Sequence, residues 1–410
     1  MDTKYNIISL FSGSGGMDLG FLRAGFNVIW ANDCNTDAVQ TYKKNIGNHI
    51  VLGDITKIPT SEINKDNLAI DVVIGGFPCQ GFSIANKNRS MQDNRNFLYL
   101  ELLRVIKETK PKFFIAENVK GILSIEGGAV IKMIIKDFEN LGYKVDYQLL
   151  NTAAYGIPQA RERVIIMGNR LGLVNEFPKI THGDKEGLKK QKTVQESIDF
   201  LQDVETSNGQ LEDFVKVKGE KIYNHIAHTN VADIFFGRKH EVNQDDICEY
   251  LKKWKNKTNN SAKKIDELFG YKNTASHWFR KDNGSGRIPK PKDWWRLKEL
   301  LGFDSEFDVA VTTFVEKPMK FSQSLRITNW NRPSDTITAS IPEIHINKKR
   351  RLSVRECAII QTFPNNFIFT GKLSSQHKQV GNAVPVLLAE IIASLIKEKL
   401  DSLIFRKNIN

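Results

Sequence analysis

The feature that most constrains this chain is a repeated alternation of short apolar runs and helical patterns across residues 6–168. The runs are rich in β-branched and aromatic residues and are bounded by Gly, Pro or Asp; they span 6–11, 27–30, 71–75, 112–117 and 164–168. Segments with helical spacing, such as 97–109 and 129–141, lie between them. Strands that alternate with helices form βαβ units. We therefore predict an α/β domain with a mostly parallel sheet.

The texture of the chain changes at about residue 181 and changes back at about residue 345. Between these points lysine, asparagine and short polar runs dominate, and the strand–helix rhythm is lost. A capping box at Ser353 and Glu356 then opens a helix, and the apolar stretch 384–400 suits a closing helix. We expect an α/β domain over 1–180, a smaller, irregular domain over 181–345, and a return to the first domain over 346–410.

Segment 262–280 of the irregular domain has the rhythm of a helix-turn-helix, with a helical pattern, a turn at Gly270 and a second short helical pattern. The second pattern places Thr274, Ser276 and His277 where such a motif contacts bases. An αα-hairpin packed in a small domain explains the same pattern equally well. Both interpretations remain open at this point.

Charge and cysteine usage narrow the class of protein. The chain has 59 Lys and Arg against 47 Asp and Glu, a formal net charge of +12, which favours a polyanionic partner. Its four cysteines are Cys34, Cys79, Cys248 and Cys357, which never form CxxC, so neither a structural zinc site nor a disulfide framework is expected. No signal-peptide pattern or uncharged apolar span is evident. We expect a cytoplasmic protein without a metal or a membrane contact.

Residues with chemical potential follow each of the first three expected strands. A glycine-rich turn leads into a helix after the first, and such a turn lets a backbone approach an anionic ligand. Acids follow the second and third strands, where ribose hydroxyls and bases are held in open parallel sheets. The turn matches neither GxGxxG nor a P-loop, so it favours a nucleoside cofactor without a pyrophosphate and disfavours a Rossmann dehydrogenase. The residues are Phe11, Ser12, Gly13, Gly15, Gly16, Asp33 and Asp54.

A second group of residues suits nucleophilic chemistry. Cys79 lies on the turn Gly75-Gly-Phe-Pro-Cys-Gln-Gly-Phe-Ser, where exposure and helix-end dipoles favour a thiolate, although a lone cysteine is more commonly a small buried hydrophobe. Glu117 follows the next strand, so both side chains are expected in one crevice. Arg161 and Arg163 can supply guanidinium donors to a carbonyl oxygen. Addition of a thiolate to an electron-poor ring fits this set.

Six segments in this order, FSGSGG, GGFPCQGFS, ENV, QARER, RPSDTIT and QVGNAVP, resemble the cytosine-C5 DNA methyltransferases. The resemblance covers about 1–170 and 330–400 and is similar to the bacterial restriction–modification type. It implies an S-adenosylmethionine-dependent methyltransferase with a Rossmann-like sheet and a smaller target-recognition domain. It also implies double-stranded DNA as substrate and a functional link to a cognate restriction endonuclease. A monomer in the bacterial cytoplasm, associated with the nucleoid through DNA, is expected.

The resemblance carries roles onto matching residues. Cys79 would attack C6 of a flipped-out cytosine, Glu117 would protonate N3, and Arg163, supported by Arg161, would hold O2. Besides the loop and the two acids, it places further residues at the cofactor: Cys34, Ile55, Phe77, Pro78, Asn382, Ala383 and Val384. Two departures are visible: Ser12 stands where alanine is usual, and Cys34 stands where some relatives carry an aromatic residue.

DNA contacts are expected from two parts of the chain. The catalytic motifs contribute Pro78, Gln80, Ser83, Asn118, Gln159 and Arg332, and the recognition domain contributes Lys272, Thr274, Ser276 and His277. The large basic insertion favours duplex DNA over the alternative of a tRNA cytosine-C5 methyltransferase. Intact catalytic motifs disfavour the other alternative, a DNA-binding homologue that has lost catalysis.

Overall fold

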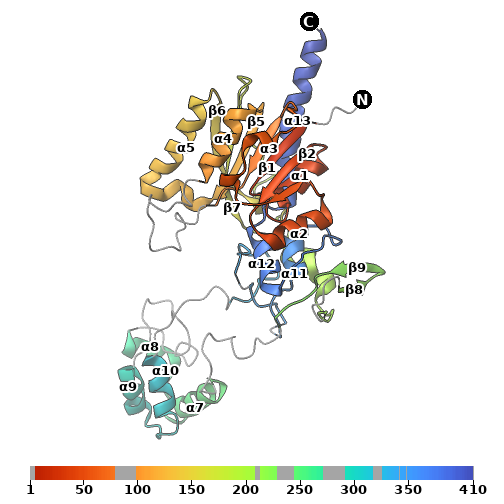
Figure 1. The fold of residues 1–410 in the computed structure, drawn as a ribbon. Helices are drawn as coiled ribbons and strands as arrows, with labels where there is room; N and C mark the ends of the chain where they lie inside the picture. Colours follow the sequence, from red (N-terminus) through yellow and green to blue (C-terminus); the bar gives the residue numbers. More distant parts are fainter. Residues whose placement is uncertain are drawn as a thin grey trace. The chain divides into compact units, whose positions relative to one another are not determined.

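The structure, a computed structural model, describes residues 5–78, 98–207, 213–228, 244–270, 291–316, 326–340, 342–347 and 349–409. The chain divides into two compact units. The first comprises Met1–His228, Thr328–Asn347 and Arg351–Asn410, and the second comprises Thr229–Ile327 and Lys348–Arg350 (Figure 1). The second unit is therefore inserted in the sequence of the first.

A seven-stranded mixed sheet forms the centre of the first unit. Its order is β3-β2-β1-β4-β5-β7-β6, and only β7 runs antiparallel to its neighbours. The expected mostly parallel α/β sheet is confirmed, and each expected strand is found within a few residues of its predicted bounds. The strands are β1 (Asn6–Leu10), β2 (Asn27–Asp33), β3 (Ile50–Leu52), β4 (Val72–Gly75), β5 (Phe113–Val119), β6 (Lys144–Asn151) and β7 (Glu162–Asn169).

Helices cover both faces of the sheet. The α-helices of the first unit are α1 (Gly16–Arg23), α2 (Thr36–Asn45), α3 (Thr60–Ile63), α4 (Tyr99–Thr109), α5 (Ala129–Asn140), α6 (Val194–Ile198), α11 (Val354–Ile360), α12 (Leu373–Asn382) and α13 (Val386–Ile409). Short 3₁₀ turns are η1 (Ile55–Lys57), η3 (Lys120–Gly128), η4 (Thr152–Tyr155) and η5 (Asp199–Leu201), and β8 (Phe214–Val217) pairs with β9 (Glu220–Tyr223).

Alternating side chains of each strand enter two different cores, because successive residues of a strand point to opposite faces. On β1, Ile7 packs with α1, α2 and α13, whereas Ile8 packs with α4 and α5. On β5, Phe113 and Phe114 divide in the same way. Figure 1 shows α4 and α5 on one side of the sheet and α1 and α13 on the other. This double burial explains why the parallel strands read as continuous apolar runs.

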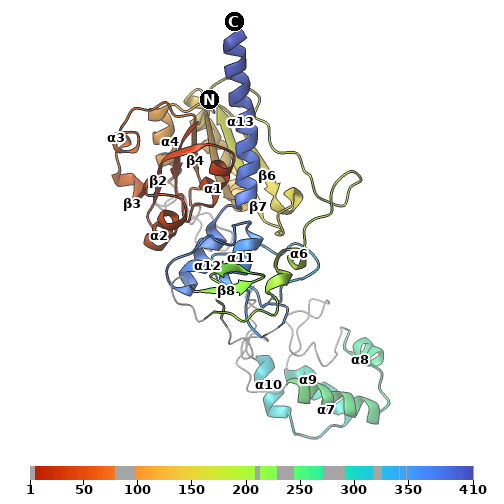
Figure 2. The same ribbon diagram turned by 90° about the vertical axis from the view of Figure 1, so that its right-hand side faces the viewer.

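The return of the chain after residue 345 completes the first unit. α13 packs along α1, where an added Cβ on Gly20 would lie 2.6 Å from the backbone oxygen of Val386 (Figure 2). The closest approach of these helices thus requires a residue without a side chain. Within Leu373–Ile404, an apolar window of mean hydropathy 1.6 is long enough to cross a membrane, but 61% of it is buried inside the structure. The described contacts are those of a core helix.

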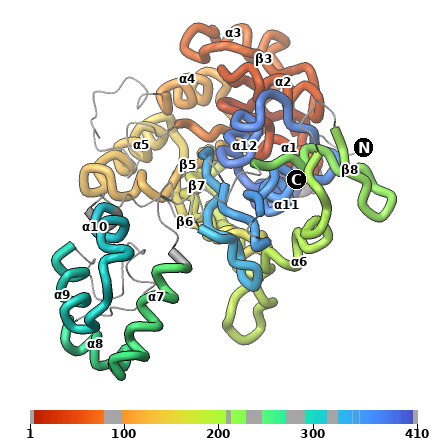
Figure 3. The backbone as a smooth tube through the Cα atoms, turned by 90° about the horizontal axis from the view of Figure 1, so that it is seen from below, coloured from red at the N-terminus to blue at the C-terminus, as the bar shows by residue number. Residues whose placement is uncertain are grey.

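A third core lies beneath α11 and α12 and gathers segments from the middle of the chain (Figure 3). Val194, Ile198 and Ile226 pack there with Trp330 and Ile337. Residues 181–228 and 328–345 therefore belong to the first compact unit, although the polar texture of the sequence groups them with the insertion. Texture misplaces them because they are loops and short elements that each bury only one or two side chains.

The second unit has its own core. It contains α7 (Gln244–Lys257), α8 (Ala262–Phe269), α9 (Pro291–Leu301) and α10 (Asp308–Glu316). Trp294 is fully buried and packs with Phe303, and its indole nitrogen donates to Asp308 over 2.8 Å. α8 begins at a Ser261 cap and ends at Gly270, whose φ of +68° forms the expected turn. The second helix expected within 262–280 lies outside the described residues.

Candidate functional site

The glycine-rich turn follows β1 and opens α1. Phe11 and Gly13 both have φ of +55°, and Gly15, with φ of +89°, precedes the helix. Ser14 is buried, and its hydroxyl has no hydrogen-bond partner among the described residues. An added Cβ on Gly13 would meet no atom within 4 Å, so the loop is open beside a buried, unused hydroxyl. Both features fit a polar ligand that approaches the backbone closely.

Asp33, at the end of β2, is tied to this turn. Its Oδ2 accepts from the backbone nitrogen of Gly13 over 2.8 Å, and its Oδ1 accepts from the nitrogen of Asn35 over 2.8 Å. Burial raises the pKa of Asp33, while these hydrogen bonds oppose the rise. Each oxygen keeps a further lone pair that could accept from a ribose hydroxyl. The neighbouring Cys34 is exposed.

Asp54 follows β3 and caps η1. Its Oδ1 accepts from the Thr56 hydroxyl over 2.8 Å and from the Thr56 nitrogen over 3.1 Å. These hydrogen bonds lower the pKa of Asp54, so the exposed carboxyl is ionised near neutral pH. Asn32 joins the two strand ends, because its amide donates to the carbonyls of Val51 and Gly53. Ile55 is buried beside Asp54.

The end of α12 lies against the start of α1. An added Cβ on Gly16 would lie 2.6 Å from the backbone oxygen of Val384 and 3.1 Å from Ala383 Cβ. Asn382, the last residue of α12, is exposed next to them. The structure thus brings 382–384 to the glycine turn, as the motif order predicts. Gly16, Asp33, Asp54 and Val384 therefore gather at one edge of the sheet.

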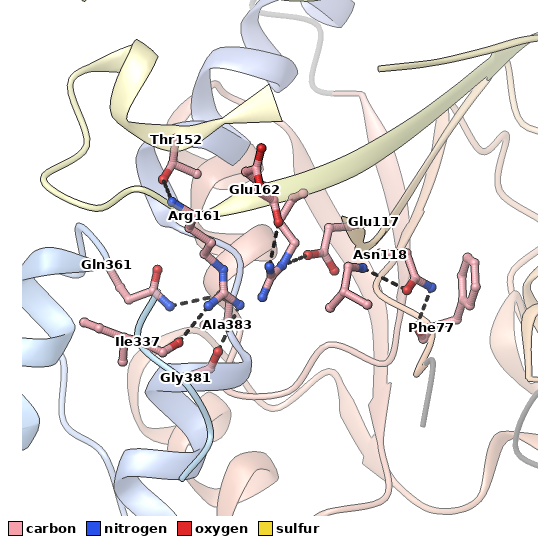
Figure 4. A network of polar contacts seen from close by, with 12 residues as sticks. Phe77, Glu117, Asn118, Thr152, Arg161, Glu162, Ile337, Gln361, Gly381 and Ala383 are labelled. Carbon is pink, nitrogen blue, oxygen red and sulfur yellow. Dashed lines mark hydrogen bonds and ion pairs between the residues drawn. The ribbon is translucent and has the colours of Figure 1, made fainter. Parts of the chain in front are cut away.

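Glu117 and Arg163 form a close ion pair on adjacent antiparallel strands, β5 and β7 (Figure 4). Arg163 Nε lies 2.7 Å from Glu117 Oε1, and the two side chains are only 12% and 11% exposed. An added Cβ on Gly76 would lie 3.2 Å from Glu117 Oε2, so the end of β4 borders the same carboxyl. A planar guanidinium and a carboxyl held this way can contact two edges of one heterocycle.

Asn118 fixes the backbone next to this pair. Its amide nitrogen donates to the carbonyl of Phe77 over 3.1 Å, and its oxygen accepts from the nitrogen of Val119 over 2.8 Å. Asn118 is 2% exposed, an internal role that differs from the expected DNA contact. Phe77 is buried and Pro78 is partly buried. Three expected site residues, Cys79, Gln80 and Ser83, lie outside the described residues.

Arg161 is fully buried and ties three motifs together. Its terminal nitrogens donate to the carbonyls of Ile337 and Gly381, each over 2.9 Å (Figure 4). Burial lowers the pKa of Arg161 well below its usual range, and the neighbouring charge of Arg163 acts in the same direction. Arg161 therefore positions the strand that carries Arg163 and is not itself open to a substrate.

Gln159 and Gln361 extend this internal network. The amide nitrogen of Gln159 donates to Gln361 Oε1 over 2.8 Å, and its oxygen accepts from the nitrogen of Ile337 over 2.9 Å. Gln361 in turn donates to the carbonyls of Val380 and Ala383. Gln159 is fully buried, which differs from the DNA contact expected for it. Gln361 was not expected at the site, since one glutamine after a helix gives no signal in sequence.

The remaining expected DNA-binding residues divide between described and undescribed parts. Arg332 is exposed and lies 3.4 Å from Asp335. Lys272, Thr274, Ser276 and His277 lie outside the described residues. Within the described ranges, no group of three or more His, Cys, Asp or Glu side chains could hold a metal ion.

Comparison with known proteins is consistent across sequence families and relatives. The profile of the C-5 cytosine-specific DNA methylases matches residues 5–398. The type II methyltransferase M.BspRI of Lysinibacillus sphaericus is 32% identical over 437 residues, which cover 96% of this chain and 82% of that protein. M.BsuRI of Bacillus subtilis is 31% identical over 433 residues, with 96% and 79% covered.

Solved structures share the fold. A DNA modification methyltransferase encoded within an E. coli prophage matches with a TM-score of 0.62 at 24% identity, over 97% of this chain and all of that one. The Entamoeba histolytica methyltransferase EhMeth matches with a TM-score of 0.54 at 18% identity, over 98% and 99% of the two chains.

Proposed function

This chain belongs to the C-5 cytosine-specific DNA methylase family and is a DNA cytosine-5 methyltransferase of the type II modification kind, and from this premise we propose how its residues act. They transfer a methyl group from S-adenosylmethionine to C5 of a cytosine flipped out of a specific duplex sequence. The observation that carries the assignment of residues is the Glu117–Arg163 pair, buried at the edge of the sheet beside the end of β4. The physiological role is protection of DNA against a cognate restriction endonuclease in the bacterial cytoplasm.

The cofactor site is formed by the glycine turn, the acids after β2 and β3, and residues 382–384. Asp33 would accept from ribose hydroxyls, and Asp54 would accept from the adenine amine. When bound, S-adenosylmethionine supplies an electrophilic methyl group. The open backbone at Gly13 and the unused Ser14 hydroxyl support a polar ligand at this turn.

The chemistry of the base falls to three residues. C5 of cytosine is a weak nucleophile, and addition of the Cys79 thiolate at C6 makes it enamine-like. Glu117 donates a proton to N3 as the thiolate adds, and Arg163 donates hydrogen bonds to O2. After methylation, water removes the C5 proton and the Cys79 thiolate leaves. A cytosine stacked in a duplex cannot reach this site, so base flipping is part of the proposal.

Target recognition is assigned to the second unit. We place the lysines of 263–281 at phosphates and Thr274, Ser276 and His277 at base edges. Lys272→Ala should weaken binding to all sequences and reduce the salt dependence by about one charge. Alanine at Thr274, Ser276 or His277 should relax discrimination by roughly 1–3 kcal/mol per lost contact. A scan of 262–280 that leaves the methylated sequence unchanged, as read by bisulfite sequencing, contradicts this assignment.

The experiment that tests the catalytic proposal is covalent trapping on duplex DNA containing 5-fluorocytosine. Wild-type protein and Cys248→Ser, a control cysteine in the second unit, should form the trapped complex with S-adenosylmethionine. Cys79→Ser should bind cofactor and DNA but form no trapped complex. Trapping of Cys79→Ser at the wild-type level would refute the assignment. Parallel bulk tRNA reactions, in which no methyl transfer is expected, test the choice of DNA.

A further inference from the structure

A chain of hydrogen bonds runs beneath the glycine turn and ends at its Ser12 side chain. The Ser12 hydroxyl donates to Ser9 Oγ over 2.8 Å, and the Ser9 hydroxyl donates to Asp18 Oδ2 over 3.0 Å. On the other side, the Tyr42 hydroxyl donates to Asp18 Oδ1 over 2.9 Å and lies 3.0 Å from His49 Nε2. Asp18, on α1, is fully buried at the centre of this chain.

The direction of the chain follows from the chemistry of a carboxylate. Ionised Asp18 can only accept, so both the Ser9 and the Tyr42 hydroxyls must turn their protons toward it. The Ser9 oxygen is then left to accept from Ser12, whose proton points inward. Since Tyr42 donates to Asp18, it accepts from His49 Nε2, which therefore carries a proton. One buried carboxylate thus orders four neighbouring polar groups.

Tyr42 also supports the turn through its ring. An added Cβ on Gly15 would lie 2.9 Å from Tyr42 Cδ2 and would collide with Ile46 Cδ1. The ring therefore packs directly under the backbone of the turn, and the hydroxyl of the same residue engages Asp18. The two contributions can be separated experimentally, because phenylalanine keeps the ring and removes the hydroxyl.

We propose that Asp18 is a positioning residue for the cofactor site: it holds the Ser12 proton inward, so that the Ser12 oxygen offers only lone pairs to the ammonium of the cofactor's methionine moiety. This inference rests on the proposed binding of S-adenosylmethionine at residues 11–16. It gives a role to Ser12, which stands where alanine is usual in the family, and to Asp18, an acid in an otherwise apolar helix face.

Protonation should disturb this arrangement. Burial raises the pKa of Asp18 to about 6, against the lowering by its hydrogen bonds to Tyr42 and Ser9. The titratable groups that face it are Tyr42 on α2, His49 before β3, and Asp33 on β2, whose charge adds to the rise. A protonated Asp18 becomes a donor to one neighbour, and the Ser12 proton is no longer held inward.

The experiment compares the affinities of wild type, Asp18→Asn, Ser9→Ala and Tyr42→Phe for two probes by calorimetry at pH 8. S-adenosylhomocysteine carries the ammonium, and 5′-methylthioadenosine lacks the amino-acid moiety. Asp18→Asn and Ser9→Ala should bind S-adenosylhomocysteine about three- to tenfold more weakly, as for one lost hydrogen bond, and bind 5′-methylthioadenosine as wild type does. Tyr42→Phe should lose less affinity, because the Ser9 branch is intact. Tyr5→Phe, which removes another hydroxyl bonded to an aspartate, is the matched control.

A pH series distinguishes positioning from a general effect on folding. Wild-type affinity for S-adenosylhomocysteine should fall as the pH decreases through about 6, and Asp18→Asn should lack that component. Its melting temperature at pH 8 should not fall, since a buried charge is removed. Unchanged affinities of Asp18→Asn and Ser9→Ala, or equal weakening for both probes, would overturn the inference. Failure of wild type to bind either probe would instead overturn the proposed cofactor site.

Discussion

At the scale of the residue, the site depends on side chains that are held by partners they do not share with solvent. Arg163 is oriented by Glu117, Asp33 by the Gly13 and Asn35 nitrogens, and Arg161 by two carbonyls. The sequence identified these residues through motifs but did not separate substrate contacts from internal ties. Burial makes that distinction, because Arg161 is 1% exposed whereas Arg163 lies at the edge of the site.

Replacing Arg163 by lysine should lower kcat about 10²- to 10³-fold, the range measured for loss of one donor to a developing oxyanion. Lysine is a point charge and cannot bond Glu117 and the base with one planar group. Cofactor affinity, measured by calorimetry, should not change. The control is Lys120→Ala, which breaks an exposed pair with Glu162 and should leave kcat near wild type.

Asp18 should also leave a signature in stability. Its pKa is 3.8 in the unfolded chain and about 6 in the fold, so the folded state binds the proton more tightly. This contribution is fully present below pH 3.8 and is lost as the pH rises through about 6, a total of about 3 kcal/mol. Relative to Asp18→Asn, wild type should lose about 1 kcal/mol in urea unfolding between pH 5 and pH 7.5. Parallel pH profiles of the two proteins would contradict the shift.

At the scale of the element, local signals in the sequence predicted those helices and strands whose burial is regular. The capping box at Ser353 and Glu356 is formed, and the strands buried on both faces are found close to their expected bounds. β6 was missed, because an edge strand with only two buried residues has no continuous apolar run. The boundaries of the insertion were displaced because residues 193–228 and 328–345 pack through scattered single side chains.

Two capping boxes offer a matched test of what burial adds to a cap. In both, the hydroxyl accepts from a glutamate nitrogen over 3.1 Å, and the glutamate accepts from the cap nitrogen over 2.7 Å. Thr193 is largely solvent-exposed, whereas Ser353 is buried and also bonds His225. Ser353→Ala should reduce the free energy of unfolding by about 2 kcal/mol and Thr193→Ala by about 0.5 kcal/mol. Equal losses in urea unfolding would show that burial adds nothing.

At the scale of the whole molecule, the first unit is assembled from both ends of the sequence. Leu388, Ile392 and Ile396 of α13 fill the same core as Ile7 and Phe21. Cofactor residues are likewise split between 11–55 and 382–384. A sequence can reveal such a return through its motifs, but not the glycine contacts that seat it.

Gly20→Val should separate the return from the rest of the fold. An added side chain meets the Val386 and Glu390 backbone, which cannot move aside as a flexible side chain could. We expect loss of several kcal/mol of stability, in the upper range for overpacking, and weakened cofactor binding because 383–384 shift from Gly16. Gly25→Ala, where the nearest atom is 3.5 Å away, tests backbone strain without this clash. Wild-type melting of Gly20→Val would contradict the close packing of α1 on α13.

The position of α13 has a consequence for how the protein is made. A ribosome releases the sheet strands first, yet one face of that sheet stays uncovered until residues 386–400 have been translated. The nascent chain must therefore be sheltered from aggregation for most of its synthesis. A message that ends early yields a polypeptide with neither a closed core nor a complete cofactor site. Methylation can begin only after almost the whole message has been read.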